Sequence, residues 1–170
     1  SKYFYSIHGS SGEIISESAD LYFKTHPVNG NSGPYRFWVL GNTGAGDINA
    51  ANVRDAYYND YPGSSETDGI LFLGDNAYNS GTDSEYQIAV FDMFESKLKN
   101  TLAWSCLGTH DGYSANSESQ TGPYYEIFTF PTYGESGGIG SGTESYYSFD
   151  YGNIHFIILN SFDESREIGS

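Results

Sequence analysis

The sequence has little positive charge. Its 170 residues include 7 Lys and Arg against 22 Asp and Glu, which gives a formal net charge of −15. Surfaces that bind nucleic acid or anionic membranes need clustered Lys and Arg, and the sequence contains no such cluster. We therefore expect no nucleic-acid partner and no membrane partner. An anionic substrate would need a local positive charge to offset the field of the chain.

Cysteine and long apolar runs are also scarce. The single cysteine, Cys106, cannot form an intrachain disulfide. Its setting in LAWSCLG is typical of a small apolar side chain in a buried strand. No apolar run reaches the ~20 residues that a membrane-spanning helix requires. The acidic, Lys-poor composition, rich in Ser, Gly and Tyr, favours an extracellular or periplasmic location.

Aromatic side chains, in contrast, are plentiful. There are 16 Tyr, 11 Phe and 2 Trp, and hydrophobic residues make up 38% of the chain. A disordered chain lacks such residues, and this length corresponds to about one domain. The composition therefore predicts a folded domain with an aromatic core.

The pattern of residues changes near position 35. Aromatic, alternating stretches at 2–7 and 21–25 predict two paired β-strands, and a Pro-, Gly- and Asn-rich linker follows at 26–34. Apolar strands are then expected at 35–40, 70–73 and 102–107, separated by helices at 47–59 and 82–100. Alternating strands and helices are typical of an α/β layer with parallel strands.

Local signals refine these elements. Asp47 can cap the first helix, whose apolar face we assign to Ile48, Ala51, Ala56 and Tyr57. Thr82 and Glu85 form a capping box at the start of the second helix. Its apolar stripe comprises Tyr86, Ala89, Val90, Met93, Phe94 and Leu98. Residues 112–145 are expected to form a long surface excursion, and 146–151 with 154–159 a β-hairpin that turns at Gly152-Asn153.

Each of the three apolar strands ends in Gly followed by polar residues. The sequences are GNTG at 41–44, GDNAY at 74–78 and GTHD at 108–111. Ligands of open α/β sheets bind beyond the carboxyl ends of the strands. We therefore expect one rim of oxygen and nitrogen donors, which hard and borderline metals prefer. It comprises Asn42, Asp75, Tyr78, Thr109, His110 and Asp111.

These blocks carry a family resemblance. VLGNTG, LGDNAY, GTHD and YSFDYGNIHFIILN resemble, in order and spacing, the blocks of the calcineurin-like metallophosphoesterases, and most closely the purple acid phosphatase branch. The resemblance covers about residues 35–165. It implies an α/β fold, a partial metallophosphoesterase α/β sandwich with a two-strand β stub at its N-terminus. Residues 1–28 would be the last strands of a fibronectin-like domain, 29–34 a linker, and 35–170 the N-terminal half of the catalytic domain.

The resemblance also implies roles for the rim residues. Asp75 corresponds to the Asp that bridges two metal ions, and Tyr78 to the Tyr that binds a ferric ion. Asn42 stands at a further metal-ligand position, and His110 stands near the leaving group with Asp111 beside it. The implied cofactor is a binuclear centre of Fe with Zn, Mn or Fe. The implied function is metal-dependent hydrolysis of a phosphate-ester substrate.

Several positions depart from the family pattern. Asn42 and Thr109 replace an Asp and an Asn ligand, and Asn160 stands where relatives often have Asp. The later His blocks are absent, and His155 is expected to pack in a strand. We therefore expect a partial or weakened hydrolase, inactive as this chain alone. The alternative is a degenerate domain that serves as an extracellular structural module and self-associates through its N-terminal β-strands.

Overall fold

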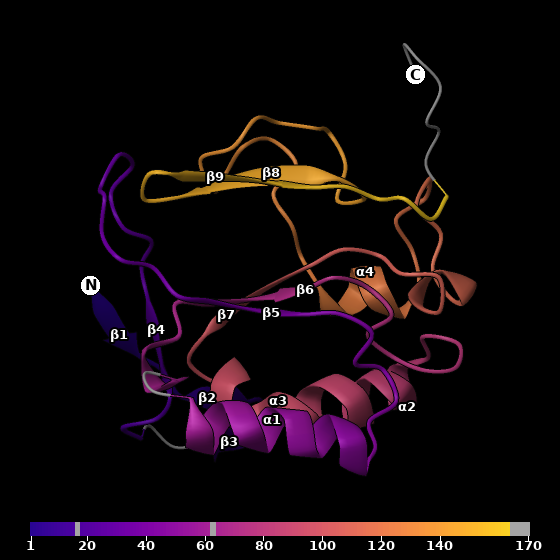
Figure 1. Ribbon diagram of the computed structural model, residues 1–170, viewed down its shortest axis with the longest axis horizontal. Helices are drawn as coiled ribbons and strands as arrows, with labels where there is room; N and C mark the ends of the chain where they lie inside the picture. The colour runs from indigo at the N-terminus through magenta and orange to yellow at the C-terminus, as the bar shows by residue number, and fades with distance from the viewer. Residues whose placement is uncertain (16–17, 62–63, 164–170) are drawn as a thin grey trace.

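The computed structural model describes residues 1–15, 18–61 and 64–163, and it is built around a three-stranded parallel sheet (Figure 1). The sheet has the order β5-β6-β7, with helices on one face and a hairpin on the other (Figure 1). The strands are β1 (Lys2–Phe4), β2 (Ile7–Gly9), β3 (Gly12–Ile15), β4 (Tyr22–Lys24), β5 (Phe37–Leu40), β6 (Gly69–Phe72), β7 (Leu102–Ser105), β8 (Tyr147–Tyr151) and β9 (Ile154–Ile158). The helices are α1 (Ile48–Asp60), η1 (Ser64–Glu66), α2 (Asp83–Tyr86), η2 (Gln87–Asp92), α3 (Met93–Leu98), η3 (Asp111–Tyr113) and α4 (Pro123–Ile127).

The parallel sheet confirms the predicted α/β layer. β6 pairs with β5 and with β7 in parallel, and every residue of β6 is buried. A strand covered on both faces must be apolar throughout, which is why GILF contains no polar side chain. The carboxyl ends of the three strands consequently lie at one edge of the sheet.

Helix α1 forms where it is predicted, and its predicted apolar face is confirmed in part. The Asp47 carboxylate caps the helix by accepting the backbone N–H of Ala50 at 3.0 Å. Ile48 is 70% exposed and Ala56 is also exposed, so the predicted apolar face is wrong at these two positions. Ala51 and Tyr57 pack against the core as predicted, and Ala50 packs beside them.

The predicted helix at 82–100 is divided into three segments. α2 and α3 flank a π-helical stretch, η2, which accommodates an extra residue in the turn. The Glu85 carboxylate accepts the backbone N–H of Thr82 at 2.8 Å, as the predicted capping box requires. The predicted apolar stripe faces the core. None of the helices in the described ranges is long and apolar enough to cross a membrane.

Residues 112–145 contribute to the core, so their prediction as a surface excursion is wrong in part. Tyr124 and Tyr125 of α4 are buried, as is Phe130. The hydroxyl of Tyr125 donates to Ser117 Oγ at 2.9 Å. These large rings occupy the space between the sheet and the hairpin. A polar loop in that space would bury hydrogen-bonding groups without partners.

The predicted hairpin of β8 and β9 covers the other face of the sheet. β8 and β9 pair antiparallel around Gly152, which has a φ of 62°. Trp104 of β7 stacks on Phe149 of β8, with ring centroids 3.8 Å apart. His155 lies in β9 as predicted, but its ring is half-exposed and its Nδ1 lies 2.7 Å from Asp150 Oδ1, so it does not pack in the sheet.

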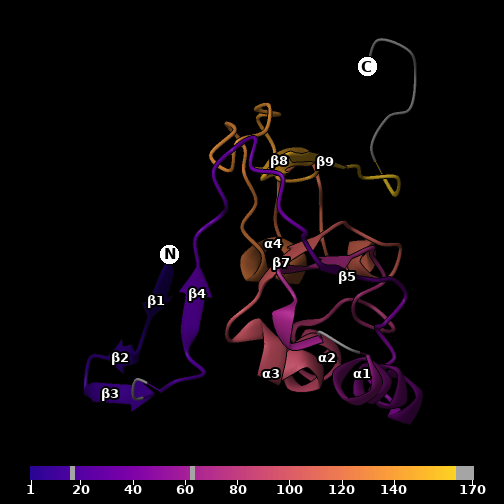
Figure 2. The ribbon, with the colours of Figure 1, turned by 60° about the vertical axis from the view of Figure 1, so that its left-hand side comes forward.

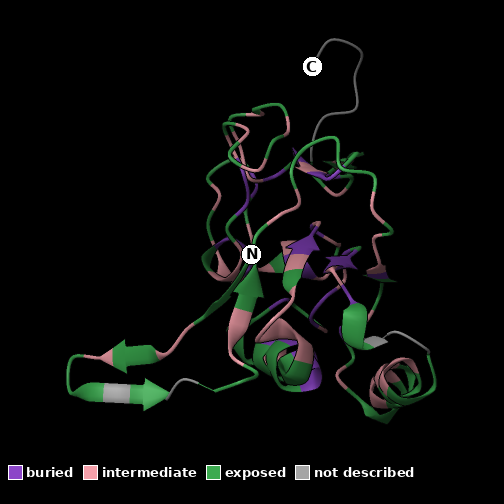
Figure 3. Cartoon of the chain, turned by 90° about the vertical axis from the view of Figure 1, so that its left-hand side faces the viewer, coloured by how far each residue is buried: buried purple, intermediate pink, exposed green. Residues whose placement is uncertain are grey.

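The N-terminal arm, defined as residues 1–15 and 18–28, extends away from the α/β body (Figure 2). β1 pairs with β4 as predicted, and β2 with β3 forms a second hairpin that the pattern did not indicate. Most of the arm is exposed (Figure 3). The Tyr5 hydroxyl donates to the Lys99 carbonyl at 2.7 Å, which ties the arm to the end of α3. Its origin in a fibronectin-like domain stays a prediction.

Candidate functional site

The loops that follow β5 and β6 are hydrogen-bonded to each other at the carboxyl edge of the sheet. The Asn42 N–H donates to the Gly74 carbonyl at 3.1 Å, and the Gly44 N–H donates to the Asp75 carbonyl at 2.9 Å. The Tyr78 N–H returns a bond to the Gly44 carbonyl at 2.9 Å. Segments 31 to 34 residues apart in the sequence are thereby fixed against each other.

Two glycines allow this close approach. A Cβ on Gly44 would lie 2.7 Å from the Ala77 nitrogen, and a Cβ on Gly108 would lie 2.0 Å from the Asp75 nitrogen. Asn42 and Asp75 themselves have positive φ values of 61° and 55°. Left-handed backbone at residues other than Gly is uncommon and concentrates at ligand-binding and catalytic sites. Both residues are therefore candidates for function on backbone geometry as well as chemistry.

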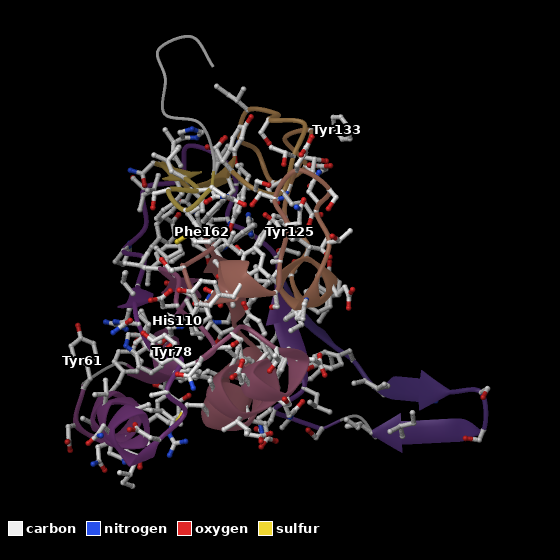
Figure 4. The ribbon with its side chains drawn as sticks, turned by 90° about the vertical axis from the view of Figure 1, so that its right-hand side faces the viewer. Tyr61, Tyr78, His110, Tyr125, Tyr133 and Phe162 are labelled. Atoms are coloured by element: carbon white, nitrogen blue, oxygen red, sulfur yellow. The ribbon has the colours of Figure 1, made fainter. Side chains whose placement is uncertain are left out.

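Four predicted site residues meet at this edge, and we call them the rim: Asn42, Asp75, Tyr78 and His110. The Tyr78 hydroxyl donates to Asn42 Oδ1, and the Tyr78 ring meets the His110 ring edge-on with centroids 4.4 Å apart (Figure 4). The His110 backbone N–H donates to Asp75 Oδ1 at 3.0 Å. The three polar turns after β5, β6 and β7 thus supply one continuous cluster.

The His110 ring is oriented by a neighbouring loop. Its Nδ1 lies 2.7 Å from the Asn79 carbonyl oxygen. Because a carbonyl can only accept, Nδ1 carries the proton, and Nε2 is the nitrogen that can gain or lose one. Glu85 holds this loop by accepting the N–H groups of Asn79 at 2.5 Å and Ser80 at 3.1 Å. Sequence reasoning assigned Glu85 only to the capping box and did not find Asn79.

Asp111 lies beneath the rim, fully buried. Its carboxylate accepts the Asn76 N–H at 3.1 Å, the Gly108 N–H at 3.0 Å and the Tyr86 hydroxyl at 2.5 Å. Burial raises the pKa of Asp111, and these donors oppose the rise by stabilising the carboxylate. We call Asn76, Tyr86 and Asp111 the floor. The structure thus separates Asp111 from the His110 ring, although the two residues are adjacent in sequence.

The pKa of Tyr78 is raised by partial burial, and the negative charge of Asp75 adds to the rise. A protonated phenol is also what the bond to Asn42 Oδ1 requires, since the amide oxygen can only accept. In this arrangement Tyr78 acts as a hydrogen-bond donor at the rim.

A polar cavity of about 470 Å³ adjoins the rim. Asn42 and Asp75 line one part of it, and Cys106, the exposed Thr109 and Phe162 line others. Burial raises the pKa of the Cys106 thiol to about 11, and the charge of Asp111 adds to the rise. The thiol follows β7 and is half-buried, so the prediction of a buried strand position holds only in part.

A centre of two metal ions does not fit the donors on these residues. Asn42, Asp75 and Tyr78 offer oxygen atoms, but only Asp75 brings a negative charge. The amide oxygen of Asn42 already accepts the Tyr78 hydroxyl. Within the described residues, no group of three or more His, Cys, Asp or Glu side chains could hold a metal ion. By their chemistry, the oxygen atoms of the rim could supply no more than part of the shell of one hard cation.

The fold is an α/β layer whose parallel strands end at the rim. The chain is similar in structure to the purple acid phosphatase PPD1 isolated from yellow lupin (Lupinus luteus) seeds, with a TM-score of 0.62 and 17% sequence identity. The match covers 97% of this chain and 31% of that one. At this identity the likeness shows the fold alone. No family model and no curated protein matches the sequence.

Proposed function

We propose that the protein is a metal-dependent phosphoric ester hydrolase of the purple acid phosphatase type, of which this chain carries a partial and weakened site. The observation that carries the proposal is the convergence of Asn42, Asp75, Tyr78 and His110 at the carboxyl edge of a parallel sheet. This edge is where open α/β sheets bind ligands. The fold similarity to a purple acid phosphatase supports the same reading.

The chain's own residues have distinct tasks in this proposal. Asp75 supplies the only carboxylate that the rim offers to a cation. His110, held through Nδ1 by Asn79, can exchange a proton at Nε2 with the leaving alcohol. Tyr78 offers a hydroxyl proton close to the same place. Within the described residues, these groups do not complete a two-metal centre.

Restoring the family ligands tests the proposal. We expect the double variant Asn42→Asp and Thr109→Asn to hydrolyse 4-nitrophenyl phosphate in the presence of Fe with Zn or Mn about tenfold or more faster than wild type, since each metal ligand adds charge or affinity. Asn and Asp are nearly isosteric and both tolerate the positive φ of position 42. Adding Asp75→Asn should abolish turnover, whereas Asp83→Asn, at an exposed position of α2, should not. The proposal is contradicted if neither the wild type nor the double variant shows metal-dependent turnover. It is also contradicted if the turnover survives Asp75→Asn.

A second candidate function is favoured by the N-terminal arm. The strands of each of its hairpins pair only with each other in the described chain. Phe4, Ile14 and Phe23 are 48%, 67% and 46% exposed. Unpaired strand edges with exposed apolar side chains invite strand addition. In this alternative the domain is a degenerate structural module outside the cytoplasm that associates with itself through the arm.

Sedimentation velocity distinguishes the second candidate. If it holds, the wild-type chain is a dimer or larger at tens of micromolar, about the range of a weak interface. Ile14→Lys should then yield a monomer, because a charge on the arm opposes strand addition. Ile139→Lys, on an exposed loop of the body, should leave the association unchanged. A monomeric wild-type protein excludes this function without affecting the first.

A further inference from the structure

A cavity of about 300 Å³ lies under the first half of α1. The Tyr57 ring of α1 stacks on Trp38, with ring centroids 4.0 Å apart, and Arg54 Nη1 donates to the Met93 carbonyl at 3.1 Å. No residue of α1 is buried, and Val53 is 60% exposed. Ala50 and Ala51 of the first half are only partly buried against the core, and α1 lies beside α2 and α3 on the same face of the sheet (Figure 2).

The wall of this cavity opposite α1 is rigid and aromatic. Trp38 and Leu40 of β5 and Phe94 of α3 line it, and all three side chains are buried. The rings of Trp38 and Phe94 meet edge-on, with centroids 5.6 Å apart. Tyr57 holds the Trp38 ring from another side. The side chains that form this wall are thus held in place by ring contacts with their neighbours.

Polar groups lie at the margin of the cavity. Arg54 lines it and shares its charge with Asp55, whose Oδ1 lies 2.8 Å from Arg54 Nη2. Thr43 also lines it, and within the described chain the Thr43 hydroxyl is buried with no hydrogen-bond partner. A polar substituent on a ligand would supply the partner that this hydroxyl lacks. An apolar pocket with few polar groups is the usual form of a small-molecule site.

We propose that this cavity binds an uncharged aromatic molecule of one or two rings with a single hydroxyl, of the phenol and naphthol class. An apolar cavity of about 150 Å³ holds benzene, so one of about 300 Å³ accommodates two fused rings with a substituent. The paired charge of Arg54 and the acidity of the chain disfavour an anionic ligand. Gly41 and Asn42 line both this cavity and the one at the rim, so a bound ring lies beside the candidate site. The inference stands whether or not the chain hydrolyses esters.

Calorimetric titration with 2-naphthol tests the proposal. We expect one site per chain with a Kd of about 0.1–1 mM, a range typical of a small apolar ligand. Ala50→Phe places a ring in the cavity and should weaken binding about tenfold or more, whereas Ala56→Phe, on the exposed side of the same helix, should leave it unchanged. If Ala50→Phe fails to fold, Val53→Phe replaces it with the same expectation.

The two indole N–H signals give an independent readout. Trp38 lines the cavity, whereas Trp104 stacks on Phe149 of the hairpin that covers the other face of the sheet. We expect 2-naphthol to shift the Trp38 signal in a nitrogen–proton correlation spectrum and to leave that of Trp104 in place. Absence of binding to the wild type, equal binding by the cavity-filling variant, or a shift of Trp104 alone would overturn the proposal.

Discussion

The rim and the floor of the candidate site use similar residues in opposite ways. Each contains an aspartate and a tyrosine whose hydroxyl is hydrogen-bonded: Asp75 with Tyr78 at the rim, and Asp111 with Tyr86 at the floor. Asp111 and Tyr86 are fully buried, whereas Asp75 and Tyr78 are half-buried. Asp75 lines the polar cavity, and the Tyr78 ring contacts the His110 ring.

This difference in burial gives the floor a structural role and leaves the rim as the candidate for chemistry. The Asp111 carboxylate of the floor accepts backbone N–H groups from the loops after β6 and β7, so it fixes the positions of those loops. At the rim, by contrast, Asp75 lines the polar cavity, and the His110 ring is bonded through Nδ1 to the Asn79 carbonyl. Buried polar groups are costly unless they are hydrogen-bonded, and the bonds that the Asp111 carboxylate accepts help the left-handed backbone of Asn42 and Asp75 to persist.

The largest effect is expected from removing the floor carboxylate. Asp111→Ala leaves the N–H groups of Asn76 and Gly108 and the hydroxyl of Tyr86 without their acceptor. We expect the free energy of unfolding to fall by about 3–5 kcal/mol, measured by urea denaturation. Asp83→Ala, at an exposed position, is the control. A decrease in the free energy of unfolding below about 1 kcal/mol would contradict this, because it would mean that water or the rim supplies the acceptor in place of Asp111.

The thiol between floor and cavity should be unreactive. Because burial raises the pKa of Cys106 to about 11, its thiolate fraction at pH 8 is roughly two hundredfold below that of an unperturbed cysteine. Alkylation by iodoacetamide, followed by mass spectrometry, should be slower by about that factor and should accelerate up to pH 11. Unfolding in urea should restore the ordinary rate. A native rate that levels off near the ordinary pKa would contradict the assigned environment.

One substitution made at two tyrosines sharpens the comparison further. Tyr86→Phe removes a buried bond to the Asp111 carboxylate, for which we expect a loss of about 2 kcal/mol in the free energy of unfolding. Tyr78→Phe removes a half-buried bond to the Asn42 amide, for which we expect about 0.5 kcal/mol. Thermal denaturation of both variants measures the difference. Equal losses would show that rim and floor are energetically alike.

Much of this architecture could be predicted from periodicity. The three apolar strands that end in Gly predict the parallel sheet and the meeting of its loops. The place of Asp111 could not be predicted, because GTHD reads as one polar turn. Asp111 begins a short 3₁₀ helix, in which successive side chains point about 120° apart. His110 therefore faces Tyr78 while Asp111 turns into the core.

Weak patterns explain the other failures. Helix α1 is rich in Ala and has no clear apolar stripe, so its capping residue could be predicted but its packed face only in part. In 112–145, Gly and Ser indicated a loop, and only the pair Tyr124-Tyr125 signalled the buried segment. In both places tertiary packing decides which side chains are covered, and local sequence carries little of that information.

Anomalous diffraction from crystals soaked in Mn²⁺ tests the central claim, that the rim is the part of this chain built to meet a cation. The account predicts a peak beside the Asp75 carboxylate, at about the 2.0–2.6 Å of a hard-cation oxygen contact, and its loss in Asp75→Asn. Mn²⁺ bound at other acidic positions with none at Asp75 would contradict it.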